Sequence, residues 1–296
     1  MKAIESSPFL RPPLSALQVL FPNLNFSDLN EKSLNAQLLV AIQDTAQKII
    51  ADKTLDDHAV EQATTQQERE GKLSSLTPKK SFICQSSLPN NDTRYYEQII
   101  FEDDIIPTRA ESWHDFFNGI IWLRFPQTKA YLNQMHISEI NAHGLNPRTK
   151  VRNHITHFDE CGIVLYIHGA DLFSHCEDLL ENQLWTGLFC GLHAEWHNSI
   201  HPVIFGHANL EMLLKPFIGL TGKVLLIQID ELPSNGRMLD SEFADTSLVA
   251  HLRQNKTMYK TKPFYPLPIL GVPRWHYEQQ DSDFYSNTQY FMPKRR

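Results

Sequence analysis

The chain has few of the residues, and none of the short patterns, that mark the common nucleotide-binding and hydrolase folds. Only twelve glycines occur in 296 residues, and neither a Walker A loop nor a GxGxxG turn is present, which argues against a nucleotide cradle. The GxSxG elbow of the α/β-hydrolases is absent, and so is the HExxH motif of a common type of zinc site. The four cysteines are scattered without a CxxC pair, so we expect reduced and mostly buried thiols.

Long apolar runs and an excess of positive charge are also missing. No apolar run approaches the roughly 20 residues that a membrane span needs. The first residues, MKAIESSPFLRPPLSAL, lack the apolar stretch of a secretion signal. Lys plus Arg number 27 against 34 Asp plus Glu, a net charge of −7, which argues against a broad nucleic-acid-binding face. We expect a cytoplasmic protein that does not associate with membranes; its partners are not indicated.

Hydrophobic residues make up 42% of the chain and aromatic residues 10%, enough for a packed core. Residues 1–52 are expected to form an N-terminal arm and a helix over Glu31–Lys53, because Leu34, Leu38, Leu39, Ile42, Ala46 and Ile49 recur at helical steps. Residues 53–80 are polar, which predicts a linker or a mobile excursion. Residues 81–296 are expected to form the main domain.

The main domain alternates short strand patterns with helical ones. Strands are predicted over Ser81–Gln85 and Tyr95–Phe101, around the turn-rich LPNNDT, and at the apolar runs Ile163–Ile167 and Val224–Ile229. Helices are predicted from Ser112 to Phe125, from Pro126 toward His136, and near residues 171–181, 183–200 and 206–216. A proline- and aromatic-rich tail after about residue 255 should run in extended form. We therefore predict a helix-rich α+β single domain around a small, largely buried sheet.

Histidines are concentrated in one third of the chain. Eleven of the fourteen lie between His114 and His207. The same stretch holds three compact polar motifs: WHDFFN at 113–118, THFDE at 156–160 and FGHANLE at 205–211. Histidine and carboxylate side chains bind transition metals and move protons near neutral pH. If the protein is an enzyme, its site is expected here.

The first motif opens the helix that begins after Ser112. At about 100° per residue, His114, Asp115 and Asn118 share one flank of a helix that is otherwise apolar nearly all round. Such a flank should line a cleft or an internal hydrogen-bonded network. The alternative is structural, because Ser112 followed three residues later by Asp115 has the spacing of a capping box.

The second motif places Asp159 and Glu160 just before a buried strand, with Arg152 upstream as a potential ion-pair partner. Carboxylates at such a position occur in hydrolytic and metal sites, and also as solvated loop residues and caps. Cys161 follows them and could be a nucleophile beside His157, although a thiol at the head of a buried strand is more typical of a core residue.

The third motif places His207 and Glu211 four residues apart, on one face of a predicted helix. This pair could supply two ligands to one metal, or a base beside its orienting carboxylate. A hydrogen-bonded pair that only stabilises the helix is the alternative. His193, His197 and His201 also recur at steps of four. A single metal could take two of them but not all three, so a solvated, mildly pH-sensitive face is the expectation there.

From about Phe82 onward the chain resembles a family of bacterial proteins known only as a domain of unknown function. The motifs that carry the likeness are IIPTRAESWHDFFNGIIWLRFPQTK, RNHITHFDECG, FGHANLEMLLKPFIGLTGK and PLPILGVPRWHYEQQDSDFYSNTQYF. The resemblance implies membership of that family and no particular activity. The resemblance associates nine polar positions with these motifs: His114, Asp115, Asn118, Arg124, Lys129, Asp159, Glu160, His207 and Glu211. It associates His157 with them less securely.

These observations leave three functional hypotheses. The leading one is a hydrolase-like enzyme in which Asp159, Glu160, Glu211 and His114 are catalytic, with Glu211 or Glu160 as base. Its candidate cofactor is a divalent metal, zinc or manganese, held by His207 and Glu211, and its candidate binding residues are Asp115, Asn118, Arg124 and Arg152. The second hypothesis is a non-catalytic binding or scaffold protein. The third and weakest is a phosphate or nucleic-acid ligand held by Arg124, Lys129, Arg148, Lys150 and Arg152.

The single-site hypothesis makes a spatial prediction. Asp159 or Glu160 should lie within roughly 8 Å of His207 or Glu211, and the flank of His114 should line the same cavity.

Overall fold

A computed structural model of the chain describes residues 7–26, 29–45, 80–231, 239–276 and 280–295. The predicted excursion lies outside the described residues except at residue 80, and so does the predicted helix beyond residue 45. The chain divides into two compact units. One comprises Leu17–Ala142, and the other comprises Met1–Ala16 with His143–Arg296. Each unit is described by itself.

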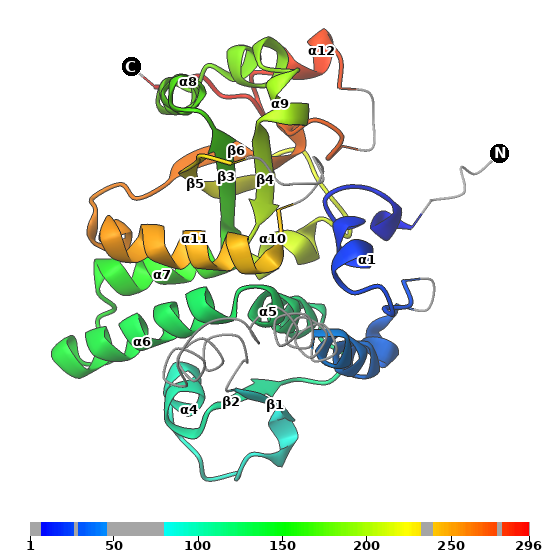
Figure 1. Ribbon diagram of the computed structural model, residues 1–296. Helices are drawn as coiled ribbons and strands as arrows, with labels where there is room; N and C mark the ends of the chain where they lie inside the picture. The colour runs from blue at the N-terminus through cyan, green and yellow to red at the C-terminus, as the bar shows by residue number, and fades with distance from the viewer. Residues whose placement is uncertain (1–6, 27–28, 46–79, 232–238, 277–279, 296) are drawn as a thin grey trace, which may run out of the picture. The chain divides into compact units, whose positions relative to one another are not determined.

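The Leu17–Ala142 unit is mainly helical and contains a two-stranded parallel sheet, β1 with β2 (Figure 1). Its elements in chain order are α1 (Ala16–Leu20), η2 (Glu31–Ser33), helical residues 34–45, β1 (Ser81–Cys84), η3 (Gln85–Ser87), α4 (Tyr96–Asp103), β2 (Ile105–Thr108), α5 (Trp113–Arg124) and α6 (Pro126–His143). Leu34, Leu38 and Ala41 are buried as a helical face. Leu39, which was predicted to share that face, is 55% exposed.

The strand predicted over Tyr95–Phe101 is wrong, because this segment forms helix α4. The backbone N–H of Tyr95 donates to Gln98 Oε1 at 3.0 Å and so caps the helix start, and Ile99 and Ile100 are buried. The second strand instead follows the helix, as β2. A parallel pair such as β1 and β2 cannot be joined by a tight hairpin, so the connection has to cross over, and α4 does this.

The predicted helices from Ser112 and from Pro126 are confirmed as α5 and α6. Ser112 caps α5, since its hydroxyl accepts from the backbone N–H of Asp115 at 3.2 Å. Every residue of α5 from Asp115 to Leu123 is buried. The helix therefore buries its polar flank together with its apolar face, as its composition predicts.

The second unit is built around a four-stranded mixed sheet of order β4-β3-β5-β6 (Figure 1). The central strand β3 pairs antiparallel with β4 and parallel with β5, and β6 is antiparallel to β5. The elements in chain order are η1 (Pro8–Leu10), α7 (Lys150–Cys161), β3 (Gly162–His168), α8 (Ala170–Glu181), η4 (Gly187–Gly191), α9 (Glu195–Asn198), β4 (Ile200–Ile204), α10 (His207–Met212), β5 (Thr221–Ile229), α11 (Ser241–Gln254), η5 (Thr257–Tyr259), β6 (Tyr265–Pro268), η6 (Ile269–Gly271) and α12 (Ser282–Tyr285).

The two apolar strand predictions are confirmed as β3 and β5, and helices α8 and α10 were also predicted. The helix predicted over residues 183–200 is broken: η4 and the short α9 replace it, and strand β4 begins at Ile200. The prolines at 266 and 268 do not prevent β6 from pairing, because it lies at the edge of the sheet. The helix-rich α+β class is confirmed. Among the described residues, no helix has the length and apolar character to cross a membrane.

The cysteine prediction is half right. Cys84, Cys161, Cys176 and Cys190 are all free thiols, but only Cys176 is buried. Burial, together with the charge of Glu195, raises the pKa of Cys176 to about 12. Cys84 and Cys190 are exposed.

Candidate functional site

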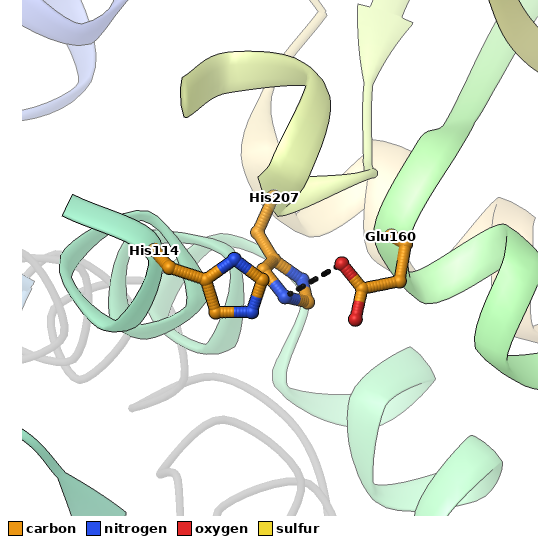
Figure 2. Close-up of side chains that lie close together, drawn as sticks. All are labelled: His114, Glu160 and His207. Carbon is orange, nitrogen blue, oxygen red and sulfur yellow. Dashed lines mark ion pairs between the residues drawn. The ribbon is translucent and has the colours of Figure 1, made fainter. Parts of the chain in front are cut away.

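The described residues of the second unit bring the second and third motifs together around His207. This histidine is the first residue of α10 and is 3% exposed. Its Nδ1 lies 3.8 Å from Asp159 Oδ2, and its Nε2 lies 3.5 Å from Glu160 Oε2. Figure 2 shows the imidazole of His207 facing the carboxylate of Glu160, which projects from the end of α7. One buried imidazole therefore has a carboxylate facing each of its ring nitrogens.

A close backbone contact positions His207. The N–H groups of Phe205 and Gly206 donate to the carbonyl of Gly162 at 3.0 and 2.8 Å. A Cβ on Gly206 would lie 2.5 Å from the carbonyl oxygen of Glu160 and 2.5 Å from the nitrogen of Gly162. Only glycine fits so close to another backbone segment. Gly206 thus lets the chain turn into α10 directly against the last turn of α7.

Further contacts fix the same junction. Asn209, which is fully buried, donates through Nδ2 to the carbonyl of Cys161 at 2.9 Å. Phe158 stacks on Phe205, with ring centroids 4.7 Å apart, and on Phe264 at 5.4 Å. Buried stacked rings of this kind hold backbone positions within narrow limits. The carboxylates and the imidazole are therefore presented by a rigid frame.

The spacing of the polar atoms is informative. Nitrogen–oxygen hydrogen bonds are about 2.7–3.2 Å long, so the 3.5 Å between His207 Nε2 and Glu160 Oε2 is longer than a hydrogen bond. Two ligands bound at about 2.1 Å to one tetrahedral metal are separated by about 3.4 Å. The pair therefore has the spacing of two ligands of one ion. Asp159 faces the other nitrogen, where a carboxylate commonly orients a metal-binding histidine.

Glu211, the fourth member of this group, lies in α10 four residues after His207 and is half-buried. The spatial prediction is confirmed for Asp159, Glu160 and His207. His114 belongs to the other unit, where it lies in the first turn of α5 and is half-buried. Its share in the site stays a prediction.

The side chain of Asp115, also on α5, is held by Arg109. Its Oδ1 accepts from Arg109 Nη2 at 2.7 Å, and its Oδ2 accepts from the backbone N–H of Arg109 at 2.6 Å and from Nε at 3.0 Å. Burial raises the pKa of Asp115, but the hydrogen bonds from Arg109 outweigh this, so the pKa is lower than usual for a carboxyl. Half of the predicted capping box is present: Ser112 caps the helix, and the carboxylate binds Arg109.

Asn118 links three elements of the same unit. Its Nδ2 donates to Tyr96 Oη at 3.1 Å, and its Oδ1 accepts from Lys129 Nζ at 2.9 Å. Lys129 is 6% exposed, and its ammonium group lies 5.2 Å from the centroid of the Trp122 ring. This hydrogen-bonded network joins α4, α5 and α6. It is the internal network that was one of the two predicted alternatives for this flank.

The basic residues that were predicted to bind a substrate, phosphate or nucleic acid make contacts within the protein itself. Arg152 is 2% exposed, and its Nη1 donates to the carbonyl of Leu145 at 2.6 Å, which ties down the segment between α6 and α7. The guanidinium of Arg148 donates to the hydroxyl of Thr156. Arg124 lies with its guanidinium carbon 5.2 Å from the ring centroid of Phe125. Binding roles for Arg124 and Arg152 stay predictions.

Cys161 is half-buried, and its environment disfavours the nucleophile alternative. Burial raises the pKa of its thiol, and the charge of Glu160 raises it further, whereas Lys223 acts in the opposite direction. A thiol with a raised pKa is mostly protonated at neutral pH and a weak nucleophile.

Sequence reasoning missed the residues that build the frame. Gly162, Gly206 and Asn209 were not singled out. A glycine directly before a histidine at a strand-to-helix turn was the available signal, because it permits a close backbone approach.

Within this helix-rich α+β fold, the α7–α10 junction holds a buried histidine and two carboxylates. The chain belongs to the family described as protein of unknown function (DUF3025), which it matches over residues 80–295. It has no match among curated proteins or among solved structures.

Proposed function

We propose that the protein is a metal-dependent hydrolase whose site is centred on His207. The observation that carries the proposal is the buried imidazole with a carboxylate facing each ring nitrogen, at 3.5 and 3.8 Å. His207 is buried and its two carboxylate neighbours are half-buried, and holding polar and charged groups together away from water is favourable when they are paired or bind an ion.

Each residue has a role in this proposal. His207 would bind the metal through Nε2, with Glu160 as a second ligand, while Asp159 would accept a hydrogen bond from the Nδ1 side and orient the ring. Glu211, on the same helix as His207, would serve as the general base that takes a proton from the attacking water. A bound divalent metal, zinc or manganese, would acidify that water and polarise the substrate.

The decisive experiment is metal analysis of protein purified without a histidine tag. We expect about one equivalent of zinc or manganese in the wild type, either as purified or after loading and removal of excess metal. Glu160→Gln and His207→Asn should lose it. Glu181→Gln and His175→Asn, which change exposed residues of α8, are the matched controls and should keep it. A wild type that retains no metal after loading would overturn the metal-dependent form of the proposal.

His114 is kept in the proposal as a further ligand or catalytic group, on the evidence of the sequence pattern. His114→Asn should then lower metal content or hydrolysis while the melting temperature stays within a few degrees. Unchanged metal content and unchanged hydrolysis would remove His114 from the site.

The rival function, a non-catalytic binding or scaffold protein, is favoured by one observation. Asp115 and Asn118 are engaged in short hydrogen bonds within the protein, as expected of polar residues that stabilise a fold. If a panel of chromogenic esters, phosphoesters and amides is not hydrolysed faster by the metal-loaded wild type than by Glu211→Gln, the scaffold hypothesis takes the lead.

A further inference from the structure

A second pair of potential metal ligands lies on the surface of the His143–Arg296 unit, in the segment that leads into and through α9. His193 and His197 are four residues apart, and both are exposed. Their ring centroids are 5.0 Å apart, with an interplanar angle of 78°. The sequence pattern left open that one metal could take two of these histidines and favoured a solvated face; the structure adds that the rings of His193 and His197 are adjacent.

The separation of the rings suits chelation. With a metal–nitrogen bond of about 2.1 Å, an imidazole centroid lies about 3.2 Å from the metal it binds. Two imidazoles on one ion then have centroids about 5.2 Å apart for tetrahedral coordination and about 4.5 Å apart for square-planar coordination. The observed 5.0 Å falls between these values.

Trp196, one of the three residues between the two histidines, anchors this segment. Trp196 is buried, stacks on Phe189 with centroids 5.8 Å apart, and donates through Nε1 to the carbonyl of Leu188 at 2.7 Å. The backbone N–H of His197 donates to the carbonyl of Ala194 at 3.1 Å. Because the inward-facing side chain is fixed, both histidines project from an ordered turn. Little conformational entropy then remains to be lost when a metal binds.

We propose that His193 and His197 form a surface site for a divalent transition metal, with copper preferred over nickel and zinc. The order follows from the general preference of nitrogen ligands. His201 is not part of it, because it lies within β4, opposite Tyr166 in the sheet. Two imidazoles and solvent therefore complete the coordination.

A nearby positive charge acts on His197. Burial lowers the pKa of His197, and the positive charges of Arg274 and His193 lower it further. Arg274 also repels a cation, so the affinity should rise when this charge is removed.

Calorimetric titration with Cu²⁺ and with Ni²⁺ tests the proposal. His193→Asn and His197→Asn should each weaken binding at this site by about tenfold or more, because the second ligand no longer adds to the first. Arg274→Gln should strengthen binding. His175→Asn is the matched control, an exposed histidine on α8, and should bind like the wild type. Both imidazoles are exposed, so thermal melts of the variants should match the wild type.

The titrations are made in the His207→Asn background, which keeps this site separate from the site of the proposed function. Paramagnetic broadening by Cu²⁺ of the ring-proton resonances of His193 and His197, before those of other histidines, is a second expected result. Single variants that bind within about threefold of their background would overturn the proposal. That outcome would leave the proposed function standing, because the His207 site is tested separately by the metal content of the wild type.

Discussion

Two groups of polar residues in this protein look alike in sequence and differ in structure. Around Asp115 and Asn118, on α5, polar atoms meet at 2.6 to 3.1 Å. Around His207, at the junction of α7 and α10, the ion-pair distances are 3.5 and 3.8 Å. Asp115 and Asn118 are buried, and at the junction His207 is buried while Asp159 and Glu160 are half-buried. Both groups come from motifs that contain histidine and carboxylate.

The α5 group forms a network of short hydrogen bonds, whereas the polar atoms around His207 have the spacing of two ligands of one ion. Short hydrogen bonds offset the free-energy cost of removing polar groups from water, so a network of them stabilises the fold. Oppositely charged groups that lie farther apart stabilise the fold less, and their spacing is suited to binding an ion between them. We therefore propose that the α5 group serves stability and that the α7–α10 junction is the reactive site, and the following four predictions test this proposal.

The largest effect is expected from Gly206→Ala. The added methyl group would meet backbone atoms of Glu160, Cys161 and Gly162 at 2.5 to 2.6 Å, so the junction must shift. We expect a loss of about 3 kcal/mol in the free energy of unfolding, or failure to fold. Denaturant titration is the measurement. Gly191→Ala is the control, because its nearest contact is an oxygen at 3.9 Å. Equal stability of the two variants would show that the junction is not tight.

Metal binding should stabilise the α7–α10 junction and not the α5 group. A metal at a hundred times its dissociation constant should stabilise the wild type by about 2.7 kcal/mol. Glu160→Gln should lose this gain and Asp115→Asn should keep it, as seen in thermal melts with and without zinc or manganese. A gain that persists in Glu160→Gln would place the metal elsewhere.

Asp115→Asn should cost about 1–3 kcal/mol, because Arg109 loses its charged partner and a buried acceptor becomes a donor. The pKa of Asp115 is lower in the folded state than its ordinary value, so its stabilisation is fully present above about pH 4 and is lost as the pH falls through the folded-state pKa.

The difference in stability between wild type and Asp115→Asn should therefore be large at pH 7 and shrink in acid. Asp171→Asn, an exposed residue in the first turn of α8, should cost only a few tenths of a kcal/mol at either pH. A difference for Asp115→Asn that does not change with pH would contradict the ion pair with Arg109.

The smallest effect on stability is expected from Glu211→Gln. As a base beside His207, Glu211 can lose its charge at a cost below about 1 kcal/mol while hydrolysis is lost. A cost of about 1–3 kcal/mol in melts that no metal shifts would instead indicate a structural hydrogen bond with His207, and the junction would then resemble the α5 group.

Local patterns in the sequence predicted the parts of the fold that are locally determined. The apolar runs became β3 and β5, and Ser112 and Pro126 mark helix starts as predicted. The segment at Tyr96 was mistaken for a strand, because a short apolar run fits either structure and the crossover between two parallel strands decides it.

For the candidate site, residue types were predictable and contacts were not. Asp159, Glu160 and His207 were selected from their chemistry, and their proximity follows. The glycines and Asn209 that create this proximity act through a non-local backbone contact, which leaves no periodic pattern. The partners of Asp115 and Asn118, namely Arg109, Tyr96 and Lys129, likewise lie on other segments of the chain.

The buried aromatic residues near the C-terminus have a consequence for synthesis. Tyr285, Tyr290 and Phe291 are buried, and the hydroxyl of Tyr290 donates to the carbonyl of Leu220 at 2.7 Å while its oxygen accepts from the N–H of Leu270. The core of the unit that carries His207 therefore includes residues up to 291, and we expect it to close only after this segment has left the ribosome. The nascent chain should resist protease only after that point, and a premature stop codon before residue 285 should yield a chain that is degraded.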